Sequence, residues 1–392
     1  MIRTAPAGYF TEEDCRLEDL VALAQTRTDL ADYPHASAIE QNVLVYDAPA
    51  LAGVIADLRQ CRALEAELAH ALMEGPGIVV FGRAFADTDI VDRASRVFFD
   101  IIENEKADGT VKGDHFGKPG ANDRVWNALE KMAVSDPDVF VEYYANDIIA
   151  LISRAWLGPN YQVTSQINVV NPGGAAQTVH RDYHLGFQSN SVAEQYPAHV
   201  HYLSPVLTLQ GAVAHVDMPI ESGPTLYLPH TQKYGPGYLA WRIPAFREYF
   251  EANYIQLPLT KGDMVFFNPA LFHAAGTNVS TDIRRMANLL QVNSAFGRAM
   301  ESIDRERVTA AIYASLRKAK EVEGFCARQL ANAIASSAEG YSFPTNLDRD
   351  QPIGGLAPLT QAELVAQAIA EDWDEERLVR AIAEQAHRKQ TS

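Results

Sequence analysis

Two histidines and an aspartate in the middle of the chain have the types and spacing of a metal site. His180 and Asp182 stand two positions apart, so both side chains share one face of an extended segment. His273 follows the strand-like run 263–268 further along the chain. Two imidazoles and one carboxylate fill one face of an octahedral ion. That set is typical of non-haem Fe(II) oxygenases, which need two open positions for a chelating cosubstrate and one for O2.

The chain also contains a second His-x-Asp pattern, His215 and Asp217. It ends a strongly apolar run, where a histidine is more often a hydrogen-bonded core residue than a metal ligand. His180 instead follows the polar loop 171–174. The spacing alone leaves both a metal site and ordinary structural roles open for His180, Asp182 and His273.

Two adjacent arginines follow His273 and could bind a carboxylate cosubstrate. Arg284 stands eleven positions after His273 and opens the strand-like run 284–293. Arginine binds a carboxylate with two parallel hydrogen bonds. Alternation along a strand places Arg284 and Arg285 on opposite faces. We expect Arg284 to face inward and Arg285 to form a surface ion pair.

Together, these residues and several further motifs resemble the phytanoyl-CoA dioxygenase family of Fe(II)/2-oxoglutarate oxygenases. The resemblance covers about residues 77–293. It implies a double-stranded β-helix (jelly-roll) core, Fe(II) on His180, Asp182 and His273, 2-oxoglutarate on Arg284, and O2 as cosubstrate. The ordered set of motifs carries it: Gly77–Phe81, Leu157–Asn160, His180–Asp182, Glu221–Leu226, Pro229–Lys233, Gly262–Phe267 and His273 with Asn278 and Arg284.

The resemblance also suggests further contacts to the cosubstrate and shows two departures. Arg124, Gln166 and Asn168 occupy places that could contact 2-oxoglutarate, although structural hydrogen bonding explains each of them equally well. The family's usual glutamine between the first two ligands is Arg181 here, which should point away from the metal. An aromatic residue often found before the 222–224 turn is Ala212 here.

Substrate contacts are expected on both sides of the metal motif. His184, Phe187 and Gln188 come just after it, and the loop 112–126 adds Lys112, His115, Lys118 and Trp126; ordinary loop packing is the alternative for all of them. The glycine-rich stretch 106–124 is long enough to cover the site. The resemblance implies oxidation of a small molecule, hydroxylation by default, with release of succinate and CO2. Asp182 argues against halogenation, because related halogenases lack that carboxylate.

The elements that must position these residues suggest a mostly β core with helices. Strand-like runs at 78–81, 161–171, 203–216, 254–257, 263–268 and 284–293 are separated by Gly, Pro and Asn, which favours a barrel or double-sheet roll. We expect a single domain, 1–392, with its core at 76–296. The flanking helical extensions are 1–75, with a helix at 50–73, and 297–392, with helices at 304–322 and 361–388. Thr360 and Glu363 have the spacing of a capping box at the start of the last helix. The C-terminal helices would cover the site or serve a homodimer.

Composition excludes several classes of protein. The chain of 392 residues carries a formal charge of −17, which disfavours nucleic-acid and membrane-surface partners. Its three cysteines form no CxxC pair, and no signal peptide or membrane segment is evident. We expect a cytoplasmic protein that acts on a small molecule.

Two rival functions stay open. One is a jelly-roll metal enzyme that does not use 2-oxoglutarate, such as a Zn or Mn isomerase or hydrolase, in which Arg284 would have no partner. The other is a non-catalytic binding module, which would be expected to have lost a ligand or the arginine.

Overall fold

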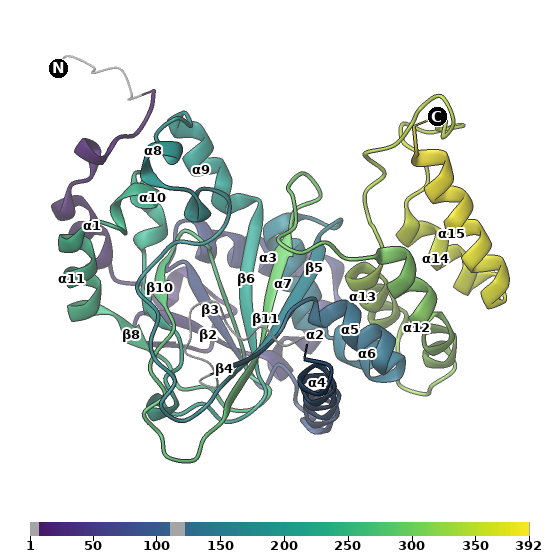
Figure 1. The fold of residues 1–392 in the computed structure, drawn as a ribbon, viewed down its shortest axis with the longest axis horizontal. Helices are drawn as coiled ribbons and strands as arrows, with labels where there is room; N and C mark the ends of the chain where they lie inside the picture. Colours follow the sequence, from purple (N-terminus) through teal and green to yellow (C-terminus); the bar gives the residue numbers. More distant parts are fainter. Residues whose placement is uncertain (1–7, 110–121, 392) are drawn as a thin grey trace. The chain divides into compact units, whose positions relative to one another are not determined.

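The computed structural model describes residues 8–109 and 122–391, which fall into two compact units (Figure 1). The first unit lies within Met1–Ala86, Lys112–Arg124 and Asn168–Leu290. The second lies within Asp87–Val111, Val125–Ile167 and Gln291–Ser392.

A mixed sheet of eight strands, in the order β1-β2-β3-β9-β6-β11-β5-β4, forms most of the β structure. β2 runs parallel to β3, and β9 pairs antiparallel with both β3 and β6. β5 and β11 are long enough to contribute residues to both units. The strands are β1 (Ala38–Glu40), β2 (Val43–Asp47), β3 (Ile78–Gly82), β4 (Asn122–Val125), β5 (Gln162–Val170), β6 (Thr208–Ala214), β9 (Met264–Phe267) and β11 (Arg285–Asn293).

A second, smaller sheet lies within the first unit. Its strands are β10 (Phe272–Ala274), β7 (Leu226–Leu228) and β8 (Ile255–Gln256), in that order. Side chains from the two sheets pack in one apolar cluster, for example Val80 and Val265 from the large sheet with Tyr227 from the small one. The first unit therefore has its core between two β layers, as a sheet-on-sheet packing requires.

The N-terminal segment is not purely helical, which differs from the expectation for 1–75. The run Val-Leu-Val-Tyr within β2 favours a strand because β-branched and aromatic side chains fit a pleated surface. The helix expected at 50–73 is interrupted at Asp57, whose carboxylate caps α3 (Leu58–Met73) by accepting from the amides of Arg59 and Gln60. α1 (Leu17–Ala24) and α2 (Ala52–Ala56) complete this segment.

Short helices connect the strands that follow the metal motif. Residues 203–206, expected in a strand, belong to a helix, and only Thr208–Ala214 of that run is extended. The four helices are α8 (Asn190–Ala193), α9 (Ala198–Val206), α10 (Gly237–Ala240) and α11 (Pro244–Asn253).

Helices dominate the second unit, where α12 (Arg305–Lys320) packs against α5, α6, α13, α14 and α15. The helix expected at 361–388 is two helices, α14 and α15, and the predicted capping box at Thr360 and Glu363 is present. The other helices are α4 (Asp89–Ala107), α5 (Ala128–Ser135), α6 (Pro137–Tyr144), α7 (Asp147–Leu157), α13 (Ala327–Ser337), α14 (Gln361–Ala370) and α15 (Glu375–Lys389). Across the described residues, no helix combines the length and apolar character that crossing a membrane requires.

Candidate metal centre

The three predicted ligands lie on two extended segments that pair within the first unit. His180 and His273 exchange backbone hydrogen bonds, with N to O distances of 2.9 and 3.3 Å. The amide of Asp182 donates to the carbonyl of Pro269 at 3.1 Å. Because β10 is the edge strand of the small sheet, the segment with His180 and Asp182 extends that sheet by one short pairing.

The ligand atoms of these side chains converge on one point. One ligand atom from each residue lies within 4.8 Å of the other two. Nε2 of His180 is 3.7 Å from Oδ1 of Asp182, and Nε2 of His273 is 3.4 Å from Oδ2. Within 8–109 and 122–391, this is the group of three that could hold a metal ion. The structure therefore brings together the three residues that the sequence singles out.

Backbone carbonyls fix the tautomer of both imidazoles. Nδ1 of His180 lies 2.8 Å from the carbonyl oxygen of Thr178, and Nδ1 of His273 lies 2.8 Å from that of Leu271. A carbonyl only accepts, so each Nδ1 carries the proton and each Nε2 keeps its lone pair. Metal-binding histidines are commonly oriented in this way. Burial lowers the pKa of His180, against the opposing effect of Asp182, which favours the neutral imidazole that a metal requires.

Asp182 is held ionised by its neighbours. Burial by itself raises the pKa of this carboxyl, but His180 and His273, when protonated, and a hydrogen bond from the Gln210 side chain hold the pKa below its usual range. Nε2 of Gln210, on β6, donates to Oδ2 of Asp182. Gln210 is not among the site residues predicted from the sequence, although its position two residues before Ala212 on the same strand places both on one face.

Arg181 points away from the metal ligands, as the sequence predicts for alternate residues. Its guanidinium is fully buried and donates to the carbonyl oxygens of Thr231 and Tyr234. It also lies over the rings of Tyr238 and Phe272, at 5.3 and 5.1 Å from their centroids. Burial lowers the pKa of Arg181 to about 10. These contacts of Arg181 hold in place the segment 180–182, which carries two of the three ligands, from the face opposite the metal site.

The expected orientation of the two adjacent arginines is wrong by one residue. Arg284 is exposed, with its Nε 3.2 Å from Asn171 and its Nη2 3.5 Å from Asp123. Arg285 is the buried one, at 7% exposure, and its Nη1 donates to the carbonyls of Ser222 and Gly276. β11 begins at Arg285, so the strand alternation starts one position later than expected.

The buried Arg285 is connected to the metal ligands through the small sheet. Its charge lies close enough to Tyr227 to affect that hydroxyl, whose pKa is raised first of all by burial. Tyr227 is the register partner of His273. Burial lowers the pKa of Arg285 to about 10, and within the described chain no carboxylate pairs with it. A buried guanidinium bonded only to carbonyls is suited to an anionic ligand.

A close approach of two turns shapes the Arg285 environment. Gly223 has φ +72°, and a Cβ there would lie 2.3 Å from the carbonyl oxygen of Thr277. Only glycine fits, and this lets the turns 222–224 and 276–278 present their carbonyls to one guanidinium.

The weaker cosubstrate candidates have different surroundings. Asn168 is half-buried on β5 in the first unit, and its Oδ1 is buried without a hydrogen-bond partner. Gln166 belongs to the second unit, where its amide contacts Gln291 and Glu301. Arg124 is partly buried on β4 in the first unit.

The residues after the metal motif occupy a strained turn. Tyr183 and His184 have φ values of +63° and +44°, which is uncommon for residues other than glycine and concentrates at functional sites. Nδ1 of His184 is 3.2 Å from Oγ of Ser204, and Phe187 is 57% exposed with its ring 5.9 Å from that of Tyr183. Gln188 is partly buried and accepts at its carbonyl from Arg242.

Most of the predicted covering loop lies outside the described residues. Lys112, His115 and Lys118 fall in this part of the chain, and α4 extends to Ala107 before it. Trp126 is partly buried in the second unit, directly after β4.

The second His-x-Asp pattern serves the fold. His215 is 1% exposed and continues the pairing of β6 with β11 through its amide, which donates to the carbonyl of Met286. Asp217 accepts from the amide of Lys261 at 2.9 Å. The interpretation of His215 as a core histidine agrees with this burial.

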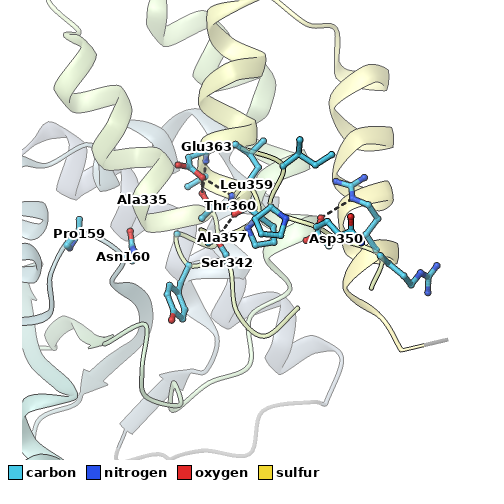
Figure 2. A pocket seen from close by; sticks show the side chains of 18 of the residues that line it. Pro159, Asn160, Ala335, Ser342, Asp350, Ala357, Leu359, Thr360 and Glu363 are labelled. Atoms are coloured by element: carbon cyan, nitrogen blue, oxygen red, sulfur yellow. Dashed lines mark hydrogen bonds and ion pairs between the residues drawn. The ribbon is translucent and has the colours of Figure 1, made fainter. Parts of the chain in front are cut away.

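A separate cleft lies within the second unit, beside the segment 341–359 (Figure 2). Its polar side chains bond to one another: Arg388 contacts Asp350 at 3.2 Å, and Thr360 and Glu363 cap α14. The Arg388–Asp350 contact joins the segment to α15, and no predicted site residue lines the cleft.

Comparison with known families gives one match. Residues 50–286, more than half of the chain, match the model of the phytanoyl-CoA dioxygenase family. No curated protein matches the sequence.

Several solved structures resemble this one at low sequence identity. The non-haem α-ketoglutarate-dependent carbocyclase SnoK from nogalamycin biosynthesis is 21% identical over 58% of this chain and 83% of its own, with a TM-score of 0.44. The epimerase SnoN from the same biosynthesis is 18% identical over 61% and 82%, with a TM-score of 0.42. HygX from Streptomyces hygroscopicus, solved with nickel, 2-oxoglutarate and hygromycin B, is 15% identical over 60% and 90%, with a TM-score of 0.41.

Proposed function

The chain belongs to the phytanoyl-CoA dioxygenase family, and from this premise we propose that it is an Fe(II)- and 2-oxoglutarate-dependent oxygenase of a small molecule. The observation that carries the proposal is the convergence of His180, Asp182 and His273 with both Nε2 lone pairs directed at one point. We further propose that the two packed sheets form the jelly-roll core of such enzymes.

The residues present fit Fe(II). Two neutral imidazoles and one carboxylate are the donor set of non-haem iron oxygenases, and they leave three positions for exchangeable ligands. When bound, the iron supplies O2 activation coupled to decarboxylation of 2-oxoglutarate, with succinate and CO2 as products. His180, Asp182 and His273 would hold it, and the carbonyls of Thr178 and Leu271 would keep both rings in the required tautomer.

Arg285 would bind the distal carboxylate of 2-oxoglutarate. It is the buried guanidinium of the pair, it has only carbonyl partners among the described residues, and it neighbours Tyr227, the register partner of His273. A bidentate ion pair with a carboxylate would compensate the burial of its charge. Asn168, with its unpaired Oδ1, is a second polar contact for a ligand in the first unit.

The substrate would contact the turn that follows the metal motif. His184 offers an imidazole, Phe187 an exposed ring and Gln188 an amide within a few residues of Asp182. Positive φ values at Tyr183 and His184 turn the chain directly after Asp182, which keeps these side chains near the metal ligands in the sequence. Hydroxylation is the proposed outcome, and retention of Asp182 excludes the halogenase ligand set from the proposal.

Anaerobic titration with Fe(II) and 2-oxoglutarate tests the proposed function. Chelation at a three-ligand site is expected to give a weak visible charge-transfer band. His180→Ala and His273→Ala should each abolish the band, because each removes one ligand. His215→Ala is the matched control: it removes a buried histidine of the other His-x-Asp pattern and should keep the band if the protein folds.

Release of succinate separates the proposal from its rivals. The oxygenase forms succinate from 2-oxoglutarate in the presence of Fe(II), O2 and a substrate identified by screening. An isomerase or hydrolase would turn over without 2-oxoglutarate, and a binding module would give no turnover. A wild-type protein that gives neither the band nor succinate would contradict the proposal.

A further inference from the structure

The nitrogen and the oxygen of the Gln210 side-chain amide have different surroundings. The side chain projects from β6 and is 7% exposed. Its Nε2 donates to Oδ2 of Asp182, whereas its Oε1 is buried and has no hydrogen-bond partner. The opposite amide orientation would set two acceptor oxygens against each other, so the contact with the ionised carboxylate determines the orientation. An unpaired buried carbonyl is unfavourable, so the bond from Nε2 to Asp182 is the dominant contact of this amide.

The backbone places Gln210 firmly beside the metal ligands. Gln210 is the register partner of Phe267 on β9. The ring of Phe267 packs against that of His273, with centroids 4.8 Å apart. One cross-strand pair thus contacts two of the three ligand side chains, Asp182 through Gln210 and His273 through Phe267.

The number of carboxylate oxygens on the metal determines how many positions stay open. Two imidazoles and one oxygen leave three positions on a six-coordinate ion, enough for a chelating cosubstrate and O2. A carboxylate that binds through both oxygens leaves only two. Gln210 uses one lone pair of Oδ2, whereas Oδ1, 3.7 Å from Nε2 of His180, accepts from no donor among the described residues and therefore has the greater capacity to bind a metal.

We propose that Gln210 is a positioning residue that restricts Asp182 to one metal-bound oxygen and thereby preserves the third open position. This inference rests on the proposed function. It predicts that loss of the Gln210 donor weakens ligands that need two open positions, while the metal itself is still bound. Partners that orient metal ligands typically affect affinity or activity by about 10- to 100-fold.

The test uses Gln210→Leu, with Gln210→Met as a second variant of similar length that also lacks the donor. The full-length protein is loaded with Co(II), and its affinities for Co(II), 2-oxoglutarate and oxalate are measured by calorimetry and by the cobalt absorption spectrum. Oxalate chelates the metal but is too short to use a distant guanidinium as well. We expect both variants to bind oxalate and 2-oxoglutarate at least tenfold more weakly. Co(II) affinity should change less, because the second carboxylate oxygen compensates.

Two comparisons isolate this role. Arg285→Leu should weaken 2-oxoglutarate but not oxalate, which separates loss of the anchor from loss of a coordination position. Gln232→Leu is the matched control, because Gln232 is also buried, at 8% exposure, with an unpaired Oε1, but donates to the carbonyls of Met73 and Gly75. It should lower stability and leave all three affinities unchanged.

The outcomes distinguish this inference from the proposed function. If wild type binds Co(II) and both chelators, and folded Gln210 variants bind oxalate as wild type does, the role of Gln210 is overturned and the proposed function stands. If wild type binds neither Co(II) nor 2-oxoglutarate, the proposed function itself fails. If neither Gln210 variant folds whereas Gln232→Leu does, Gln210 is a core residue and the positioning role is overturned.

Discussion

Arg284 and Arg285 are adjacent, and the residue at which β11 begins determines which of the two guanidinium groups is buried. Arg285→Leu is expected to weaken 2-oxoglutarate binding at least tenfold, because removing one partner of a buried charged pair typically costs about 2–5 kcal/mol. The measurement is a 2-oxoglutarate titration of the anaerobic Fe(II) charge-transfer band. Arg284→Leu is the matched control. It removes an exposed side chain that contacts Asp123 and Asn171, and should bind nearly as wild type does. Reversed effects would restore Arg284 as the anchor.

The three metal ligands could be predicted from the sequence, but which of the two arginines is buried could not. His180 and Asp182 share a face in any extended segment, so their convergence follows from spacing alone. For Arg284 and Arg285, alternation shows only that they face opposite ways. Which one faces inward depends on where β11 starts after the turn at 276–278, and local sequence does not reveal that starting point.

Among the elements, strands made of continuous apolar runs could be predicted from the sequence, whereas segments with a weak local preference could not. β3, β5 and β9 lie where β-branched and aromatic runs predict them. Residues 203–206 form the end of α9, a helix that contains Pro205, and the mixed run Leu-Ser-Pro-Val has no strong local preference for either structure. The break at Asp57 follows from its cap, a signal that a purely periodic pattern does not reveal.

α10 provides a stability test of the segment that carries two ligands. A Cβ on Gly237 would lie 2.0 Å from Cζ of Arg181, and that guanidinium is held by two carbonyls in a closed site. Gly237→Ala is therefore expected to lower the free energy of unfolding by about 1–3 kcal/mol, measured by urea denaturation. Gly53→Ala is the control: it lies in α2 with open space around it and should be neutral or slightly stabilising. Equal effects would show that Arg181 can move aside.

The turn before η6 (Thr231–Lys233) should make stability depend on pH. Burial, and then the charge of Lys233, lower the pKa of His230 to about 4. An unfolded imidazole titrates near 6.5, so the unfolded chain binds the proton more strongly between these values. The contribution of His230 to the free energy of unfolding should therefore be fully present above about pH 6.5, and it should be lost as the pH falls toward about 4.

A variant isolates this contribution. His230→Asn removes the imidazole and keeps a residue that tolerates the left-handed backbone, φ +70°. Urea denaturation of both proteins between pH 7.5 and 4.5 should show a shallower decline for the variant. Identical declines would assign the pH dependence to other groups.

For the whole molecule, the chemistry and the C-terminal helices belong to different units. His180, Asp182, His273 and Arg285 all lie in the first unit, whereas α12–α15 lie in the second (Figure 1). The sequence predicted the C-terminal helices and the Thr360 capping box from local signals. Composition and periodicity could not predict the division at 167/168 and 290/291, because it falls inside β5 and β11, where the strand pattern is uninterrupted.

This division predicts that the stability of α14 and the affinity of the metal site are separable. Thr360→Ala removes the side chain that accepts from the amide of Glu363, and loss of such a cap typically costs about 1 kcal/mol. The free energy of unfolding should fall by this amount, while Ni(II) affinity, measured by calorimetry well below the unfolding temperature, stays as in wild type. Thr360→Ser retains the hydroxyl and should recover the stability. A loss of Ni(II) affinity in folded Thr360→Ala would contradict the separation and would indicate that the C-terminal helices help to shape the metal site.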